Sequence, residues 1–179
     1  MSDAHAHSSA DHKHNPYPKF WLIMAVSFVV MYVVMYFHTY TWDHIILSEM
    51  RFYMTCLMIL AMMVTMLLLM SGMYPDRRKN LGILAFAVIG FATVVYIERS
   101  QVFVQDESWM KSMIPHHSIA ILTSERAEIT DVRVKQLAEE IIEAQRREIA
   151  EMKWLLEDIE ANGEVASEAE LRGREVPSF

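Results

Sequence analysis

Three long apolar runs dominate the first hundred residues of the chain. They cover residues 20–37, 52–70 and 81–97, and none of them contains a charged residue. At 1.5 Å per residue, each is about as long as a helix that crosses a hydrocarbon core of roughly 30 Å. The remaining polar chain is too short to cover three such helices in a soluble protein. The pattern therefore predicts three membrane-spanning helices over residues 20–98, in contact with a lipid bilayer.

The orientation of these spans follows from the cations in their connections. The connection over residues 74–80 contains three cations, whereas that over residues 39–51 contains only Arg51. Lysine and arginine concentrate in cytoplasmic loops. We therefore expect the N-terminus to lie in the cytoplasm and all residues after Ile97 to lie outside the membrane on the opposite face. In a bacterial inner-membrane protein, that face borders the periplasm. The first run is too long for a cleavable signal peptide.

Beyond residue 98 the chain becomes charged, with the periodicity of helices. One helix is predicted over residues 106–128 and a second from the turn at 129–131 to about residue 160, with Thr130 or Asp131 as its N-cap. Pro115 leaves two alternatives, a kinked continuous helix or a new helix that begins near Ser112. The predicted organisation is a His-rich tail (1–19), a three-span region (20–98), a helical hairpin (99–160) and a flexible C-terminal tail (161–179).

The second helix of the hairpin carries an apolar stripe interrupted by a carboxylate. Glu148 lies near the centre of this stripe, with Gln145 and Met152 beside it. A carboxylate in an apolar seam is costly unless it is paired or bound to a metal. We therefore expect the partner helix to bring a cation, a hydrogen-bond donor or a metal ligand to Glu148.

The first helix offers two methionines and two adjacent histidines within eight residues. Met110, Met113 and His117 are spaced i, i+3 and i+7 and share a face, with His116 at its edge. Thioethers and imidazoles together suit copper, while histidine with a carboxylate also suits zinc. The predicted metal ligands are His116, His117, Met113 and Glu148, with Met110, Met152 and Gln145 as further candidates.

A two-helix hairpin buries too little surface to be stable alone. We expect it to pack on the membrane surface or to pair with a second copy through residues 105–160. Pairing would form a four-helix bundle, a common scaffold for metal sites. The predicted fold class is therefore all-α, with three spans and a hairpin that forms a homodimer or a higher oligomer.

These motifs resemble a known family. The segment from Met110 to His117, followed by Ala120-Ile121 and then by Gln145, Glu148 and Met152, is similar to the bacterial family called domain of unknown function 305. The resemblance covers about residues 105–157 and implies a ferritin-like helical bundle, secreted or membrane-anchored. Some members are associated with copper binding and tolerance. Many continue with methionine and cysteine where this chain has Thr123 and Ser124, so two soft ligands are missing here.

Composition narrows the function further. The net charge of −7 argues against nucleic-acid binding, and the single cysteine excludes a disulfide framework. A short histidine tract in the tail can bind metal weakly, and the second span contains a ladder of methionines spaced by four residues. These sets are His5, His7, His12 and His14, and Met54, Met58, Met62, Met66 and Met70.

Three functions remain open at this stage. The leading hypothesis is a non-enzymatic, membrane-anchored protein that binds or buffers copper, as Cu(I) or Cu(II), on the outer face. The second is a metal transporter or channel that uses the methionine ladder. The third is a structural oligomer in which a histidine–glutamate pair fixes the helix register. The sequence contains no visible catalytic or cofactor motif that favours an enzyme.

Overall fold

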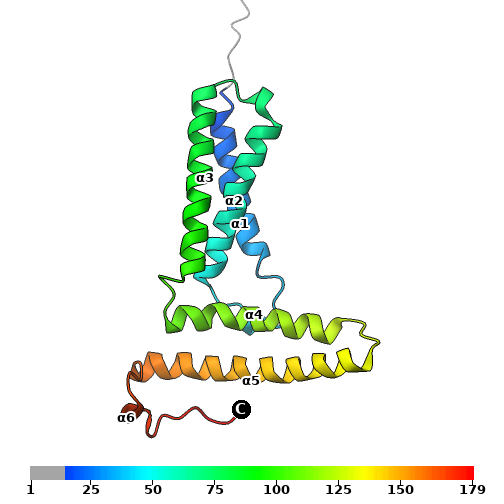
Figure 1. The fold of residues 1–179 in the computed structure, drawn as a ribbon, viewed down its shortest axis with the longest axis vertical. Helices are drawn as coiled ribbons and strands as arrows, with labels where there is room; N and C mark the ends of the chain where they lie inside the picture. The colour runs from blue at the N-terminus through cyan, green and yellow to red at the C-terminus, as the bar shows by residue number, and fades with distance from the viewer. Residues whose placement is uncertain (1–14) are drawn as a thin grey trace, which may run out of the picture.

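The three apolar runs form a bundle of three helices. A computed structural model describes residues 15–179 as all-α, with α1 (Tyr17–Val34), α2 (Glu49–Leu69) and α3 (Arg77–Ser100) side by side (Figure 1). Each is long and apolar enough to cross a membrane, which indicates a membrane protein as predicted. Short 3-10 helices, η1 (Trp42–His44) and η2 (Ser71–Met73), lie in the two connections. The predicted histidine tract lies outside the described residues.

The bundle packs tightly around α2. Phe20 and Ala87 are fully buried in its core. At Gly90, a Cβ atom would lie 3.2 Å from Leu60 Cδ2, so α3 approaches α2 more closely here than most side chains would allow. The lack of a side chain at Gly90 therefore allows Leu60 of α2 to pack closely against α3.

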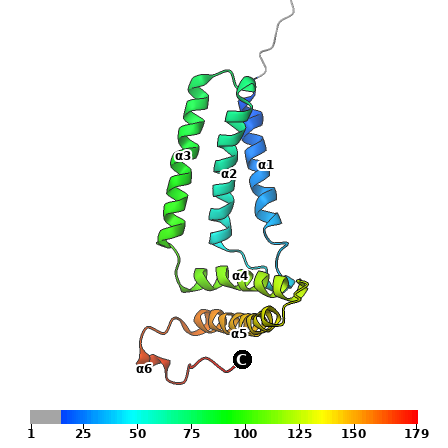
Figure 2. The same ribbon diagram turned by 45° about the vertical axis from the view of Figure 1, so that its right-hand side comes forward.

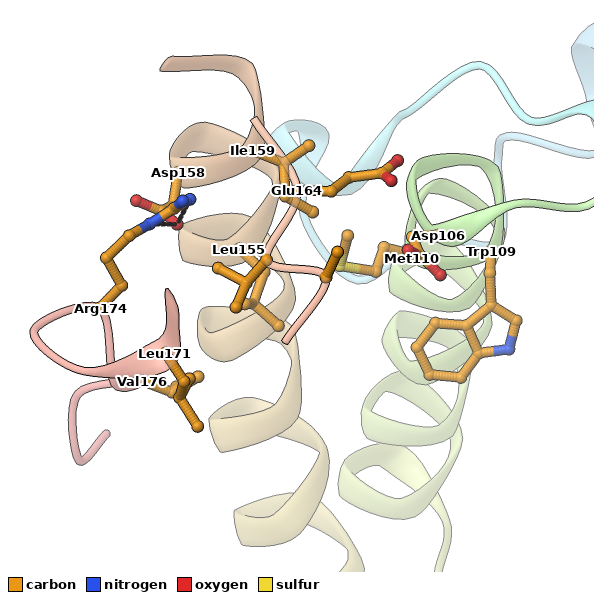
Figure 3. A pocket seen from close by; sticks show the side chains of 12 residues that line it. Asp106, Trp109, Met110, Leu155, Asp158, Ile159, Glu164, Leu171, Arg174 and Val176 are labelled. Atoms are coloured by element: carbon orange, nitrogen blue, oxygen red, sulfur yellow. Dashed lines mark hydrogen bonds and ion pairs between the residues drawn. The ribbon is translucent and has the colours of Figure 1, made fainter. Parts of the chain in front are cut away.

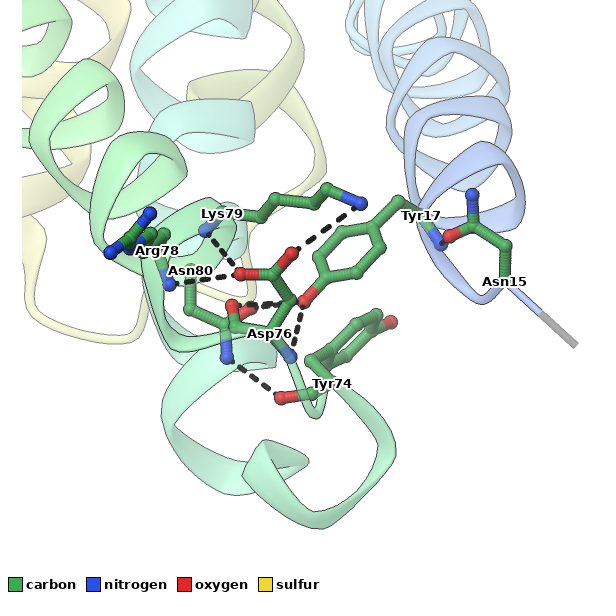
Figure 4. Close-up of polar contacts among 7 residues, drawn as sticks. All are labelled: Asn15, Tyr17, Tyr74, Asp76, Arg78, Lys79 and Asn80. Atoms are coloured by element: carbon green, nitrogen blue, oxygen red, sulfur yellow. Dashed lines mark hydrogen bonds and ion pairs between the residues drawn. The ribbon is translucent and has the colours of Figure 1, made fainter. Parts of the chain in front are cut away.

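A polar network closes the end of the bundle at which the three cations lie (Figure 4). Asp76 caps α3 by accepting hydrogen bonds from the backbone N–H groups of Arg78 and Lys79, at 3.0 and 3.1 Å. The Tyr17 hydroxyl accepts from the Asp76 N–H at 3.1 Å and lies 2.9 Å from Asn80 Oδ1, to which it can donate. The start of α1 is thereby tied to the start of α3. The cap also accounts for the start of α3 at Arg77, four residues before the third apolar run begins.

The hairpin lies across the other end of the bundle. It consists of α4 (Asp106–Arg126) and α5 (Val132–Asn162), with α4 between the bundle and α5 (Figures 1 and 2). Pro115 lies inside α4, so of the two alternatives the structure contains the continuous helix. Asp131 caps α5 by accepting from the Arg133 N–H at 2.9 Å. Both helices run roughly perpendicular to the bundle (Figures 1 and 2).

The hairpin is fastened to the bundle through the connection between α1 and α2. Ser118 of α4 is fully buried, and its hydroxyl accepts from the Tyr40 N–H at 2.7 Å and lies 2.9 Å from His44 Nδ1. Lys153 of α5 forms a 2.6 Å ion pair with Asp43 of the same connection. The connection therefore holds both helices of the hairpin and orients α4 relative to the bundle.

The C-terminal segment folds back on α5. It contains the short helix α6 (Glu168–Leu171), and the Arg174 guanidinium pairs with Asp158 and donates to the Gly163 carbonyl at 2.8 Å. Leu171 and Val176 face Leu155 across a pocket at this end of the hairpin (Figure 3). In the structure, this segment covers the end of the hairpin farthest from the α4–α5 turn.

Candidate metal centre

A histidine and a glutamate meet between the two hairpin helices. His117 Nε2 lies 2.9 Å from Glu148 Oε2. The His117 side chain is only 11% exposed, whereas that of Glu148 is 40% exposed, so the carboxylate reaches solvent on one side. The site is consequently buried at its imidazole and open at its carboxylate, which leaves a route for a small ion.

The backbone fixes the orientation of the imidazole. His117 Nδ1 lies 2.8 Å from the Met113 carbonyl oxygen, and because a carbonyl can only accept, Nδ1 carries a proton. Nε2 is then the atom that faces Glu148. A histidine whose second nitrogen donates to a carbonyl is the arrangement usual for a metal ligand.

The contact between Nε2 and the carboxylate requires a proton of its own. Nδ1 already donates to Met113, so a hydrogen bond between Nε2 and Glu148 needs a second proton, on either the imidazole or the carboxylate. A metal cation can replace that proton, since it accepts the lone pairs of both atoms. The position between His117 Nε2 and the Glu148 carboxylate therefore suits a cation.

The other predicted ligands on α5 lie at different distances from the pair. Gln145 is closest and donates from Nε2 to the same Glu148 oxygen at 3.3 Å. Met152 is buried one helical turn beyond Glu148, in an apolar cluster with Ile114 and Ile149. Gln145 thus steadies the carboxylate, and Met152 contributes to the apolar wall of the site.

The predicted ligands on α4 do not all face Glu148. Met110 is buried seven residues before His117, where it lines the pocket beside Leu155 (Figure 3). His116 is exposed and lines a different cavity, between α4 and the bundle, and Met113 lines that cavity too. Successive residues on a helix differ by about 100°, so the two adjacent histidines point to different neighbours.

The site within one chain is incomplete as a metal centre. Across residues 15–179, no three His, Cys, Asp or Glu side chains gather in a group that could hold a metal. Two ligands at about 2.05 Å around a tetrahedral ion lie about 3.3 Å apart, so the 2.9 Å contact would open by a few tenths of an ångström. The residues present fit half of a zinc or copper site, and further ligands must come from water or from a second chain.

The methionine ladder of α2 does not share one interior face. Met54, Met58 and Met70 are each about 40% exposed, whereas Met62 and Met66 pack against the core of the bundle. Residues four apart drift around the helix, which accounts for this distribution. The ladder therefore begins on the outside of the bundle, packs against its core at Met62 and Met66, and is exposed again at Met70.

Sequence reasoning missed the residues that position the centre. Ser118 and His44 fix α4 to the bundle, yet neither belongs to an apolar stripe or to a ligand motif. Burial lowers the pKa of His44, and the nearby Lys153 charge lowers it further, while Asp43 raises it. The Lys153 ammonium in turn holds the pKa of Asp43 far below its usual range. Ser118 is a single polar residue inside a helix, and its place in the sequence gives no signal that could have identified this anchor.

Comparison with known proteins places the hairpin and its tail in one family. Residues 98–176 match the family described as domain of unknown function (DUF305). An uncharacterized protein of Acanthamoeba polyphaga mimivirus is 38% identical over 109 residues, which cover 60% of this chain and 70% of the viral protein. No solved structure matches the chain.

Proposed function

The chain belongs to the family known as domain of unknown function (DUF305), and from this premise we propose that it is a membrane-anchored metal-binding protein. Its bundle anchors the hairpin at the bilayer, and the hairpin binds copper at His117 and Glu148. The function is the buffering of copper, or tolerance to it, on the outer (periplasmic) face, with zinc as the competing metal. Catalysis is not part of this proposal.

The geometry of the His117–Glu148 pair carries this proposal. A buried imidazole, oriented by the Met113 carbonyl, presents Nε2 to a carboxylate at 2.9 Å. A neutral imidazole and a carboxylate suit Zn(II) and Cu(II), because both atoms donate lone pairs to the ion. The partly exposed carboxylate provides the entry path.

The exposed end of the apolar stripe of α5 favours pairing with a second copy of the chain. The first turns of α5 leave Val134 and Leu137 about half exposed, although both lie on the apolar stripe of this helix. Pairing of two hairpins through this surface would cover the stripe and form a four-helix bundle. A homodimer through residues 105–160 is therefore part of the proposal.

Metal titration of the purified full-length protein in detergent tests the proposal. We expect Cu(II) and Zn(II) to bind wild type, and His117→Ala and Glu148→Gln each to weaken binding by at least about tenfold, since each removes or neutralises a ligand. His116→Ala is the matched control, because its side chain faces the bundle cavity instead of Glu148. Equal affinities in wild type and His117→Ala would refute the site.

A structural function is the alternative that this same contact favours. A buried histidine–glutamate pair can fix the register of two helices without any metal. In that case His117→Ala and Glu148→Gln would each lower the melting temperature, and the decrease for each variant would be the same in metal as in chelator. Under our proposal, metal raises the melting temperature of wild type and leaves that of Glu148→Gln nearly unchanged.

A further inference from the structure

A second cavity lies on the opposite side of α4 from the His117–Glu148 pair. It has a volume of about 460 Å³ and lies where the end of α1 and the start of α2 meet α4. The α4 residues that line it, among them Met113 and His116, follow the i, i+3 spacing of a single stripe. A different stripe of α4, with Met110, Ile114 and His117, is buried against α5. Met113 lies at the boundary between the two stripes, because it lines the cavity and also packs against the apolar cluster between α4 and α5.

The cavity is lined by an unusual concentration of soft metal ligands. Three separate elements each contribute at least one methionine, and two of the three contribute a histidine. These residues are Met35, His38, Met50, Met54, Met113 and His116. Met50 and Met54 are spaced i, i+4 at the start of α2, so they share one face of that helix. The middle of α4 lies far along the sequence from the connection after α1 and the start of α2, and folding brings side chains of all three around one space.

The charges around the cavity select among metal ions. Among the described residues that line it, none is an aspartate or a glutamate. One wall contains Arg51, which is 7% exposed, donates to the Met35 carbonyl at 2.6 Å and lies over the Tyr36 ring at 4.3 Å. A fixed positive charge with no carboxylate in the lining disfavours a divalent ion more than a monovalent one. Neutral thioethers and imidazoles select a soft monovalent ion instead.

We propose that this cavity is a second metal site, which binds a monovalent soft cation of the Cu(I) class between the membrane bundle and the hairpin. Its candidate ligands are Met50, Met54, Met113, His38 and His116, all of which line the cavity. Met35 takes a smaller part, because its sulfur already accepts a hydrogen bond from the Thr55 hydroxyl at 3.4 Å. The site uses neither the His117 nor the Glu148 side chain, so its test is independent of the test of the function proposed above.

The second site gives each of the two adjacent histidines of the hairpin a ligand set of its own. His117 faces α5 and a carboxylate, which suits a divalent ion, whereas His116 faces methionines, which suit a monovalent one. Both histidines are carried by the same turn of α4. The two oxidation states of copper would therefore bind on opposite sides of a single helix.

Silver provides a redox-inert probe for the cavity. Ag(I) is titrated into the full-length protein in detergent, with the four tail histidines replaced by alanine in every sample. We expect the triple variant Met54→Leu, Met113→Leu, His116→Ala to lose one equivalent of bound Ag(I), and sulfur neighbours to disappear from the silver X-ray absorption spectrum. Methionine to leucine nearly conserves volume, so the fold should persist, and circular dichroism checks this.

Two controls separate this site from others. Met58→Leu with Met62→Leu makes the same substitutions one and two turns further along α2, away from the residues that line the cavity, and should keep the full Ag(I) stoichiometry. His117→Ala should also keep it, although it loses Cu(II). Wild-type Ag(I) stoichiometry in the triple variant, or equal losses in the triple variant and the ladder control, would overturn the proposal.

Discussion

Removal of the Ser118 hydroxyl should loosen the hairpin from the bundle. Its oxygen accepts from the Tyr40 N–H at 2.7 Å and pairs with His44 Nδ1 at 2.9 Å, and Ser118 is fully buried. Ser118→Ala leaves both partners without this bond. Each unsatisfied buried group costs about 1–3 kcal/mol, and because Tyr40 is half-buried we take the lower part of the range, about 2–4 kcal/mol in total.

Hydrogen exchange in detergent measures this loosening directly. At about 1.4 kcal/mol per factor of ten, 2–4 kcal/mol corresponds to exchange roughly 30- to 1000-fold faster for the amides of residues 40–46 if they exchange by local opening. Ser112→Ala is the matched control, since that hydroxyl donates to the Trp109 carbonyl of its own helix, and it should change stability by no more than about 0.5 kcal/mol. Unchanged exchange in Ser118→Ala would refute the assignment of this contact as the anchor.

Three further predictions follow from burial and charge. Burial lowers the pKa of His44 in the folded protein, so the unfolded chain binds a proton at this histidine more readily. The melting temperature should therefore be highest above about pH 6.5 and fall as the pH drops below that value. His44→Gln should make the melting temperature depend less on pH. Ile114→Ala should destabilise the hairpin by about 2–5 kcal/mol in thermal or chemical unfolding, whereas Val132→Ala, at an exposed position, should have little effect; similar losses would contradict the packing. Wild type should sediment as a dimer in detergent and Leu137→Glu as a monomer, and a dimeric variant would exclude this face as the interface.

Periodicity predicted the elements of this fold well, because burial of apolar residues decides them. The three uncharged runs became α1, α2 and α3, and the hairpin helices begin and end within two residues of their predicted bounds. The turn before α5 was predicted with Thr130 or Asp131 as the N-cap, and of the two it is the Asp131 carboxylate that caps the helix. Local capping extended the third span at its start, a contribution that a count of apolar residues does not include.

The arrangement around the candidate site was harder to predict. Helix spacing was sufficient to bring His117 and Glu148 together, because both lie on buried stripes of antiparallel helices. It was not sufficient to place His116 and Met113, since their neighbour is a bundle whose position over α4 depends on Ser118 and the connection after α1. A face that packs against a second neighbour cannot be recognised from one helix pair, so the sequence suggested one site, whereas the structure distributes the candidate ligands over two places.

A crystal structure of the metal-loaded protein, with anomalous scattering recorded at the copper and zinc edges, tests the central claim most directly. We expect an anomalous peak about 2.0–2.2 Å from both His117 Nε2 and Glu148 Oε2, with these two atoms moved apart to about 3.3 Å from their 2.9 Å contact. A fully loaded crystal in which the metal peaks lie elsewhere and the His117–Glu148 contact remains closed would contradict the account.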